Sequence, residues 1–323
     1  MKNYIFFGFF LTLFACQFTE NKENEELAKG DESIDTSLAI ELGEALFFDS
    51  MLSLDSSISC SSCHLPEFAF ADTARVSKGV HDQFGFRNTP SIFNLKGKPF
   101  FFMEGGVENL HRATLGPMLT EEEMSLQAPQ LLERIASNEH LHQNFIRAYG
   151  EGYEYRDVVD ALVQYQLSLK SLDAEWDRYT VSGGDGEWER GRALFNSDSL
   201  NCSTCHPAPL FRDDKFHDLG LAHGEPLDYG RGRLTFDSTD YYKFPSPSLR
   251  NVALTAPYMH DGSIETLKEV IELYQAGGGP RKPNDLSTTF QLNDQDTQAL
   301  LRFLESLTGD AAKSAHHRAQ SNG

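Results

Sequence analysis

The chain has 323 residues, of which 40% are hydrophobic and 11% aromatic, which is sufficient for two packed domains. Its 28 basic and 48 acidic side chains give a formal net charge of −20. This negative charge excludes nucleic acid and anionic membrane surfaces as partners that are recognised through charge.

Residues 1–15 are predicted to be a signal peptide. The apolar run that starts at Tyr4 is too short to span a bilayer but suits a signal-peptide core. It ends in Leu-Phe-Ala-Cys, which resembles the lipobox of bacterial lipoproteins and implies a periplasmic protein anchored by lipid on Cys16. An ordinary export signal with an incidental Cys16 is the alternative. Residues 16–36 are polar and acidic and are predicted to be a flexible tether, so membrane contact is expected only through the anchor.

The other four cysteines form two copies of one pattern. Cys-Ser-Ser-Cys-His occupies residues 60–64, and Cys-Ser-Thr-Cys-His occupies residues 202–206. Exported proteins commonly pair cysteines in disulfides, but neither a disulfide nor a zinc site requires His directly after the second Cys twice. Two thioethers and an adjacent imidazole are what covalent haem attachment needs. The sequence therefore predicts two haem c groups, bound by Cys60, Cys63 and His64 and by Cys202, Cys205 and His206.

Helical patterns repeat around the two motifs. A short amphipathic helix is expected before each motif, at residues 42–47 and 190–195. A further helix ends each half: the first has its apolar positions within 158–169, and the second starts at 293–294, has its apolar positions within 300–307 and stops at Gly309. Strand-like alternation is scarce, and the Gly-rich stretch 182–186 is the clearest linker.

We therefore predict a mainly α fold of two tandem cytochrome c-like haem domains with long loops. The N-terminal domain is expected to span residues 37–181 and the C-terminal domain residues 187–310. The last residues, 311–323, are predicted to be a disordered tail.

Further motifs resemble the bacterial di-haem cytochrome c peroxidases and the related MauG group, which oxidises protein tryptophans. They are Arg-Asn-Thr-Pro-Ser at 87–91, Leu-Gly-Pro at 115–117, Pro-Ser-Leu-Arg-Asn-Val at 247–252, and the segment 254–262, which contains Pro-Tyr-Met-His-Asp-Gly. The resemblance runs from about residue 42 to residue 308.

The resemblance implies that the N-terminal haem, with His64 as proximal ligand, is the one that binds peroxide. It assigns the acid–base group of peroxide cleavage to Glu123, counted from Pro117. A solvated acidic helix start formed by the neighbouring glutamates is the alternative. His81 lies in the loop that carries an iron-capping His in many members, and an ordinary exposed loop His is the alternative.

For the C-terminal haem, whose proximal ligand is His206, the resemblance implies Tyr274 as distal ligand, as in the MauG group. Met259 is the rival ligand, and a core role for Tyr274 is the remaining alternative. Two positions depart from the family: Met103 replaces a Trp between the haems, and Ala113 replaces a Gln. The loss of the Trp puts fast sharing of oxidising equivalents in doubt.

Family members commonly bind calcium between their two domains. The matching positions are Asn88, Thr255 and Pro257, whose amide and carbonyl oxygens suit this hard cation, although turn formation explains them as well. The other histidines are expected to be surface groups rather than ligands: His111, His140, His142, His217, His223, His316 and His317.

These observations predict a periplasmic peroxidase that reduces hydrogen peroxide with electrons from a small cytochrome or copper protein. The donor is expected to dock near the second haem and to be basic or weakly charged. A MauG-like oxidase that modifies a protein side chain and a non-catalytic di-haem electron carrier are the alternatives. The sequence leaves the oligomeric state open between monomer and homodimer.

Overall fold

The computed structural model describes residues 34–221, 227–281, 283, 285–286 and 289–322. The predicted signal peptide, Cys16 with most of the tether, and His223 lie outside the described residues. Within the described ranges, the structure has no helix of the length and apolarity that crossing a bilayer requires.

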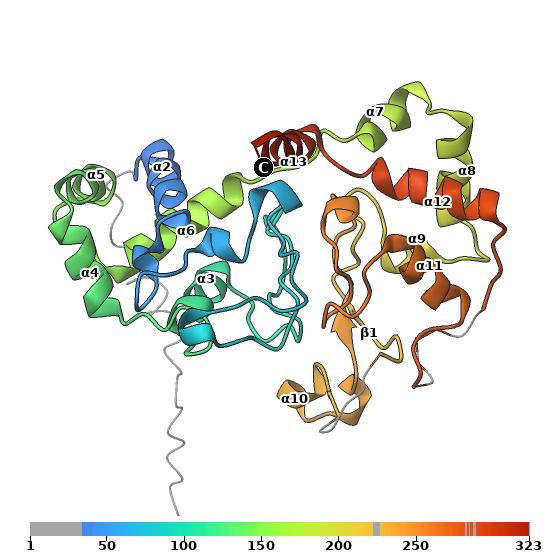
Figure 1. Cartoon of the computed structure of the whole chain (residues 1–323), viewed down its shortest axis with the longest axis horizontal. Coiled ribbons are helices and arrows are strands. Elements are labelled where there is room, and N and C mark those ends of the chain that lie inside the picture. Colours follow the sequence, from blue (N-terminus) through green and yellow to red (C-terminus); the bar gives the residue numbers. More distant parts are fainter. Residues whose placement is uncertain (1–33, 222–226, 282, 284, 287–288, 323) are drawn as a thin grey trace, which may run out of the picture. The chain divides into compact units, whose positions relative to one another are not determined.

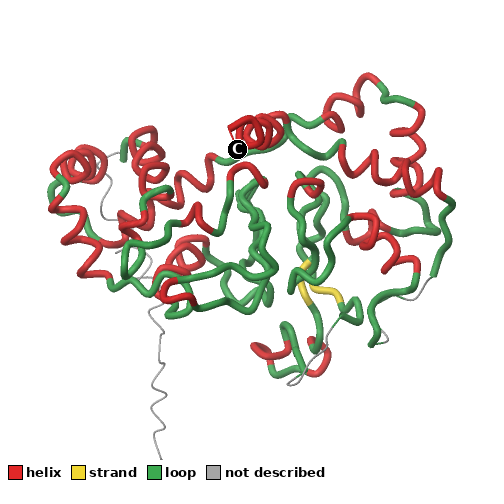
Figure 2. Tube along the Cα trace, viewed as in Figure 1, coloured by secondary structure: helices red, strands yellow, loops and turns green. Residues whose placement is uncertain are grey.

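Helices dominate the secondary structure, and long loops connect them (Figure 2). The N-terminal half contains α2 Thr36–Phe47, η1 Ser50–Leu52, η2 Cys60–Ser62, η3 Pro66–Phe68, η4 Val80–Asp82, α3 Leu110–Leu119, α4 Ala128–Ser137, α5 Glu139–Tyr149 and α6 Tyr155–Ser168. The C-terminal half contains α7 Glu175–Ser182, α8 Gly186–Phe195, α9 Cys202–Cys205, β1 Phe216–His217, α10 Gly232–Thr235, η5 Ser238–Asp240, β2 Phe244–Pro245, η6 Val252–Leu254, α11 Leu267–Gln275, α12 Asp294–Glu305 and α13 Asp310–Asn322. The prediction of a mainly α fold with long loops is confirmed.

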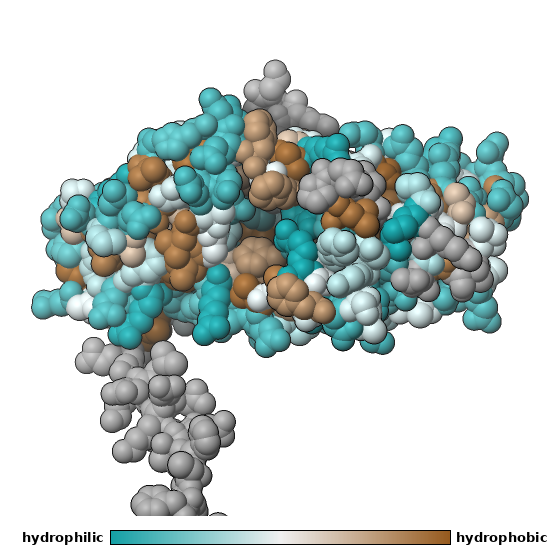
Figure 3. All heavy atoms as spheres, turned by 90° about the horizontal axis from the view of Figure 1, so that it is seen from below, coloured by the Kyte–Doolittle hydropathy of each residue, from teal (hydrophilic) through white to brown (hydrophobic). Residues whose placement is uncertain are grey.

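The only strands in the described part of the chain are β1 and β2, which pair antiparallel with Phe216 opposite Pro245 and His217 opposite Phe244. Each is two residues long, so the pair fixes a loop rather than forming a layer of its own. Hydrophilic side chains cover much of the face shown in Figure 3, as the acidic composition leads one to expect.

Each half is built on one pair of crossing helices, α2 with α6 and α8 with α12 (Figure 1). Both crossings need a glycine because the two backbones touch. A Cβ on Gly43 would lie 1.9 Å from the Ala161 carbonyl oxygen, and a Cβ on Gly191 would lie 1.9 Å from that of Ala299. The two predicted helices before the haem motifs are thus equivalent parts of a repeated unit.

Each helix pair forms the centre of its own hydrophobic core. In the first, Leu42 and Phe47 pack with Leu162, and in the second, Trp188 packs with Phe303. The second core also receives apolar side chains from α7, although the predicted N-terminal domain extends to residue 181.

A buried polar hub joins the two halves. Asn94 and Asn251 occupy equivalent places in the repeated Pro-Ser-x-x-Asn motif, and their backbone N–H groups donate to the carbonyls of Leu169 and Leu307, just after α6 and α12. Ser171 bridges them: its N–H donates to Asn94 Oδ1 (3.0 Å) and its hydroxyl to Asn251 Oδ1 (2.9 Å). All three side chains are buried, so these hydrogen bonds fix the relative register of the two repeats.

The prediction that residues 311–323 are disordered is wrong, because α13 continues as a helix to Asn322. The helix packs on η3, with Ala312 fully buried. The His316 ring lies against Phe68, and its Nδ1 is 2.9 Å from the Glu67 carbonyl oxygen. This surface is formed by a segment far away in sequence, and it stabilises a helix that the polar sequence alone does not predict.

The glycine contact predicts a strong position-specific effect on stability. Gly191→Ala should force α8 and α12 apart and lower the free energy of unfolding by about 3 kcal/mol. The matched control is Gly186→Ala in the same helix, where a new Cβ meets nothing within 4 Å. Urea unfolding of the purified proteins measures both, and equal stability of the two variants would contradict the close helix crossing.

Candidate functional site

The first attachment loop, residues 60–72, begins with the short helix η2, which places both thiols and the imidazole of the first motif on one turn. The His64 N–H donates to the Cys60 carbonyl (2.9 Å), and the Ser59 N–H donates to the Ser62 hydroxyl (3.0 Å). Burial raises the pKa of Cys60 to about 12 and that of Cys63 to about 11. Neither thiol is in a disulfide.

The second attachment loop, residues 202–214, repeats this arrangement. The helix α9 spans both cysteines, and the His206 N–H donates to the Cys202 carbonyl (3.0 Å). Burial raises the pKa of Cys202 to about 11. Both cysteines are free thiols here as well, so each loop offers two sulfurs and one imidazole within a single turn.

Each motif imidazole is held by a backbone carbonyl. His64 Nδ1 donates to the Phe70 carbonyl oxygen (2.9 Å), and His206 Nδ1 donates to that of Phe211 (3.0 Å). Burial lowers the pKa of both imidazoles, which keeps them neutral. A neutral ring that donates from Nδ1 presents the lone pair of Nε2, the arrangement typical of an imidazole that ligates a metal. The donor set of both loops therefore fits covalently attached haem.

The carbonyls that receive these hydrogen bonds are themselves fixed. Phe70 (φ 57°) and Phe211 (φ 53°) both adopt the left-handed backbone conformation, which costs about 1 kcal/mol for a side chain with Cβ. The preceding carbonyls accept hydrogen bonds from Ser91 and Ser248, each 2.6 Å long. Sequence reasoning missed this role of the two serines, although their repeated Pro-Ser-x-x-Asn motif was a detectable signal.

The structure brings Glu123 close to the first motif, since its carboxylate contributes to the raised pKa of Cys63. Its backbone carbonyl accepts a hydrogen bond from Val80 N–H (2.8 Å), which joins it to the loop of His81. Burial and the neighbouring Glu122 raise the pKa of Glu123. Glu121, by contrast, is exposed, so the three glutamates are not equivalent.

The side chain of His81 is exposed. The residue has φ 55°, its side chain is 57% exposed, and its Nδ1 lies 3.9 Å from Asp55 Oδ2. The capping role of His81 stays a prediction.

Tyr274, on α11, lies near the second motif. Burial, together with the nearby Cys202 and Cys205, raises the pKa of its hydroxyl well above its usual range. Met259, the rival ligand, is in a tight turn with φ 77° in which its carbonyl accepts from Gly262 N–H (3.2 Å). The geometry thus brings an oxygen donor to the second loop, and its role as iron ligand stays a prediction.

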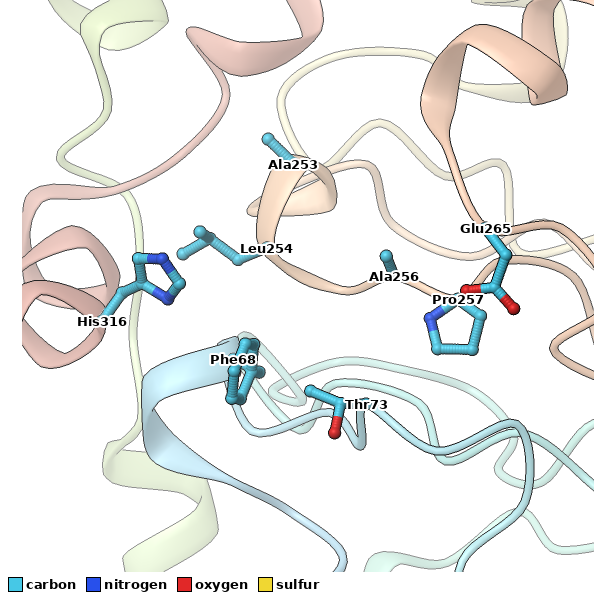
Figure 4. Close-up of a pocket in the computed structure, with 8 residues that line it drawn as sticks. All are labelled: Phe68, Thr73, Ala253, Leu254, Ala256, Pro257, Glu265 and His316. Atoms are coloured by element: carbon cyan, nitrogen blue, oxygen red, sulfur yellow. The ribbon is translucent and has the colours of Figure 1, made fainter. Parts of the chain in front are cut away.

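The predicted calcium residues lie where the two halves meet. The Asn88 N–H donates to the His260 carbonyl (3.0 Å), and its Nδ2 donates to the carbonyls of Ala74 and Arg75 (3.3 Å each), which leaves Oδ1 for another partner. A cavity of about 310 Å³ opens nearby, with His316 at one end and Pro257 beside Glu265 at the other (Figure 4). Its lining is Phe68, Thr73, Ala253, Leu254, Ala256, Pro257, Glu265 and His316. The calcium site stays a prediction.

An ionic network that the sequence did not predict follows Met103. Buried Glu104 accepts from Arg87 Nε (2.9 Å) and from an Arg233 guanidinium nitrogen (2.9 Å). Arg87 also pairs with Asp228 of the other half (2.5 Å), so these residues connect the two halves near the position where the family has Trp. Ala113, the other departure, is buried in the first core.

The remaining described histidines differ in exposure. His111, His140 and His317 are exposed as expected, whereas His142, His217 and His316 are half-buried. His217 Nδ1 lies 3.9 Å from the sulfur of the free Cys205 thiol and its Nε2 pairs with Asp213 (2.7 Å), contacts that raise its pKa to about 9.

Comparisons with known proteins agree with this duplicated geometry. Residues 37–185 match the family model described as di-haem cytochrome c peroxidase, and residues 188–308 match the cytochrome c model. The chain is 33% identical to methylamine utilization protein MauG of Methylorubrum extorquens, over 84% of this chain and 79% of that protein. It is 30% identical to cytochrome c peroxidase Ccp of Escherichia coli, over 84% of this chain and 58% of that protein.

Among solved structures, a MauG-like protein associated with microbial copper homeostasis is 30% identical, with a TM-score of 0.80 over 86% of this chain and 92% of that one. The diheme peroxidase BthA from Burkholderia thailandensis has a TM-score of 0.74 at 24% identity, and covers 87% of this chain and 88% of its own. The predicted fold of two tandem cytochrome c-like domains is confirmed, and two such domains imply two haem c groups.

Separate attachment loops predict separate loss of the two haems. When Cys60 and Cys63 are both replaced by serine, intact-mass spectrometry should show one haem fewer, because no sulfur remains to form the first pair of thioethers. Replacing Cys202 and Cys205 in the same way is the matched variant and should remove the other haem. Retention of two haems by either double variant would contradict the assignment.

Proposed function

The chain belongs to the family of di-haem cytochrome c peroxidases and MauG proteins, and we propose that it reduces hydrogen peroxide to water with electrons from a small donor protein. The observation that carries the proposal is the difference between two otherwise equivalent loops. Glu123, an acid–base group with a raised pKa, lies near the first loop, while Tyr274 lies near the second. One loop is therefore suited to peroxide chemistry and the other to electron transfer.

When bound at the first loop, haem c would supply the redox-active iron at which peroxide is reduced. The Cys60 and Cys63 sulfurs would hold the cofactor, and His64, whose Nδ1 donates to the Phe70 carbonyl, would offer Nε2 to its iron. Glu123 would take a proton from one peroxide oxygen and return it to the oxygen that leaves as water. Two electrons and two further protons complete the reduction of one peroxide molecule to two water molecules.

Electrons are proposed to enter singly beside the second loop, from a small cytochrome or copper protein. With a net charge of −20 on the chain, a basic or weakly charged donor is favoured. The apolar start of the sequence and the lipobox-like Leu-Phe-Ala-Cys support a periplasmic location with an anchor at Cys16.

We further propose one calcium ion between the halves, held by Asn88 and by the carbonyls of Thr255 and Pro257. The orientation of the Asn88 amide supports this, because its Nδ2 donates to two carbonyls and hard cations select amide and carbonyl oxygens such as its Oδ1. Glu265, which lies beside Pro257 in Figure 4, adds negative charge on the same side of the cavity.

A MauG-like oxidase that acts on a protein side chain is the second candidate function. The position of Tyr274 near Cys202 and Cys205 favours it, since an oxygen ligand stabilises oxidised iron. Met103 opposes this candidate, because its thioether replaces the easily oxidised Trp ring that the family has between the haems. Steady turnover of peroxide with a reduced cytochrome as donor separates the peroxidase from this oxidase and from a non-catalytic carrier.

Glu123→Gln should slow peroxide turnover by about 100- to 10,000-fold, because an amide can neither take nor return the proton. The absorption spectrum of the protein should remain unchanged. Glu121→Gln is the matched control, since this exposed neighbour carries the same charge two residues away. Equal turnover by the two variants would sink the role of Glu123.

The same group predicts the acid limit of activity. Only the ionised carboxylate accepts a proton, and burial raises the pKa of Glu123, so turnover should fall as the pH drops through a value above the ordinary 4.5. A pH–rate profile measures this fall. The fall at low pH should be absent from the residual activity of Glu123→Gln.

Tyr274→Met should raise the midpoint potential of the second haem and change its spectrum, because a neutral thioether replaces a phenolate oxygen. Met259→Leu is the matched control for the rival ligand and should leave both quantities as they are. The reverse pattern, with the effect confined to Met259→Leu, would transfer the ligand role to Met259.

A further inference from the structure

The two attachment loops differ in the residue that follows the carbonyl donor to the imidazole. Ala71 follows Phe70 in the first loop and is fully buried. Arg212 follows Phe211 in the second loop and is also buried, at 9% exposure. A guanidinium cation thus stands in the second copy where the first has a methyl group, one residue from the carbonyl that holds His206.

The positive charge of Arg212 is only partly neutralised by the groups around it. Its Nε lies 2.9 Å from Asp214 Oδ1 and is without a hydrogen bond among the described residues. Lys98 of the N-terminal half lies close to Arg212. Arg212 donates to the Asn94 carbonyl (3.5 Å), and the turn that follows is closed by a hydrogen bond from Lys98 N–H to the Leu95 carbonyl. Burial and the Arg212 charge lower the pKa of Lys98 to about 8, so it is still mainly charged at pH 7. The two cations Arg212 and Lys98 therefore share one carboxylate, that of Asp214.

The other charges of the two loops increase this difference. Asp213 has a histidine partner, since its Oδ2 lies 2.7 Å from His217 Nε2. Its counterpart in the first loop, buried Asp72, accepts hydrogen bonds from Ala74 N–H and the Ser77 hydroxyl, and it meets no cation in the described part of the chain. The second loop thus has a buried guanidinium at the place of Ala71 and a histidine partner for its aspartate, whereas the aspartate of the first loop has neither among the described residues.

The positive charge of the other arginine that is buried in the described part of the second half is neutralised by a carboxylate. Arg250 occupies the place of Phe93 in the repeated motif and lies over the Phe211 ring. Two of its nitrogens bind the Asp177 carboxylate, at 2.6 and 2.9 Å, so this pair is neutral.

We propose that Arg212 and Lys98 raise the reduction potential of the second haem and so make it the point at which electrons enter. Reduction removes one positive charge from the iron, so a nearby buried cation favours the reduced form and a nearby anion the oxidised form. The pair opposes the lowering of the potential that a Tyr274 ligand would cause. The assignment of electron entry to the second haem rests on the proposed function. The predicted rise in the reduction potential of that haem does not depend on it.

The test is a potentiometric titration of the full holoprotein at pH 7, with each haem followed by its own electron paramagnetic resonance signal. Arg212→Ala gives the second loop the residue of the first and should move the second midpoint to lower potential, with the first unchanged. Lys98→Met should shift it in the same direction. Lys96→Met is the matched control, because Lys96 is exposed in the same loop.

Lys98→Met decides the question if Arg212→Ala fails to fold with two haems. A second midpoint that moves no further than in Lys96→Met would overturn the proposal. The titration uses neither peroxide nor donor protein, so a chain that fails to turn over peroxide can still show the predicted shift. Failure of the proposed function and failure of this inference are therefore distinguishable.

Discussion

The hydrogen bond from a motif imidazole to a backbone carbonyl is the interaction on which both haem sites depend. It fixes the tautomer of His64 and His206 and leaves Nε2 of each ring for iron. The carbonyl is available only because Phe70 and Phe211 accept a left-handed conformation. That conformation is maintained by the serine and asparagine of the repeated motif, which attach the loop to the end of a core helix.

The two attachment loops are built alike, and the proposed division of function rests on the residues that differ between them. In the proposed function, Glu123 is the proton acceptor beside the first loop, and Tyr274 is the oxygen donor beside the second. The second loop also has the buried Arg212 where the first has Ala71. A duplicated scaffold can thus assign peroxide chemistry to one iron and electron uptake to the other without any change in how the haems are attached.

Local features of this chain could be predicted from sequence, and long-range ones could not. The Cys-x-x-Cys-His motifs and the core helices are encoded within a few residues, so they were predicted correctly. The ion pair of Arg87 with Asp228 joins residues 141 positions apart, and neither side chain is distinctive alone. The helix α13 needs the surface around Glu67, 249 positions before His316, and for this reason its polar sequence was misread as disordered.

Cyanide binding tests most directly whether the two irons have different roles. Electron paramagnetic resonance of the purified holoprotein, fully oxidised and after one-electron reduction, shows how many irons take an added ligand. We expect cyanide to convert only the first haem, with half of the total iron changing its signal in the state that is competent for peroxide. Two irons that both stay low-spin and unreactive in both states would contradict the division of roles and leave the chain an electron carrier.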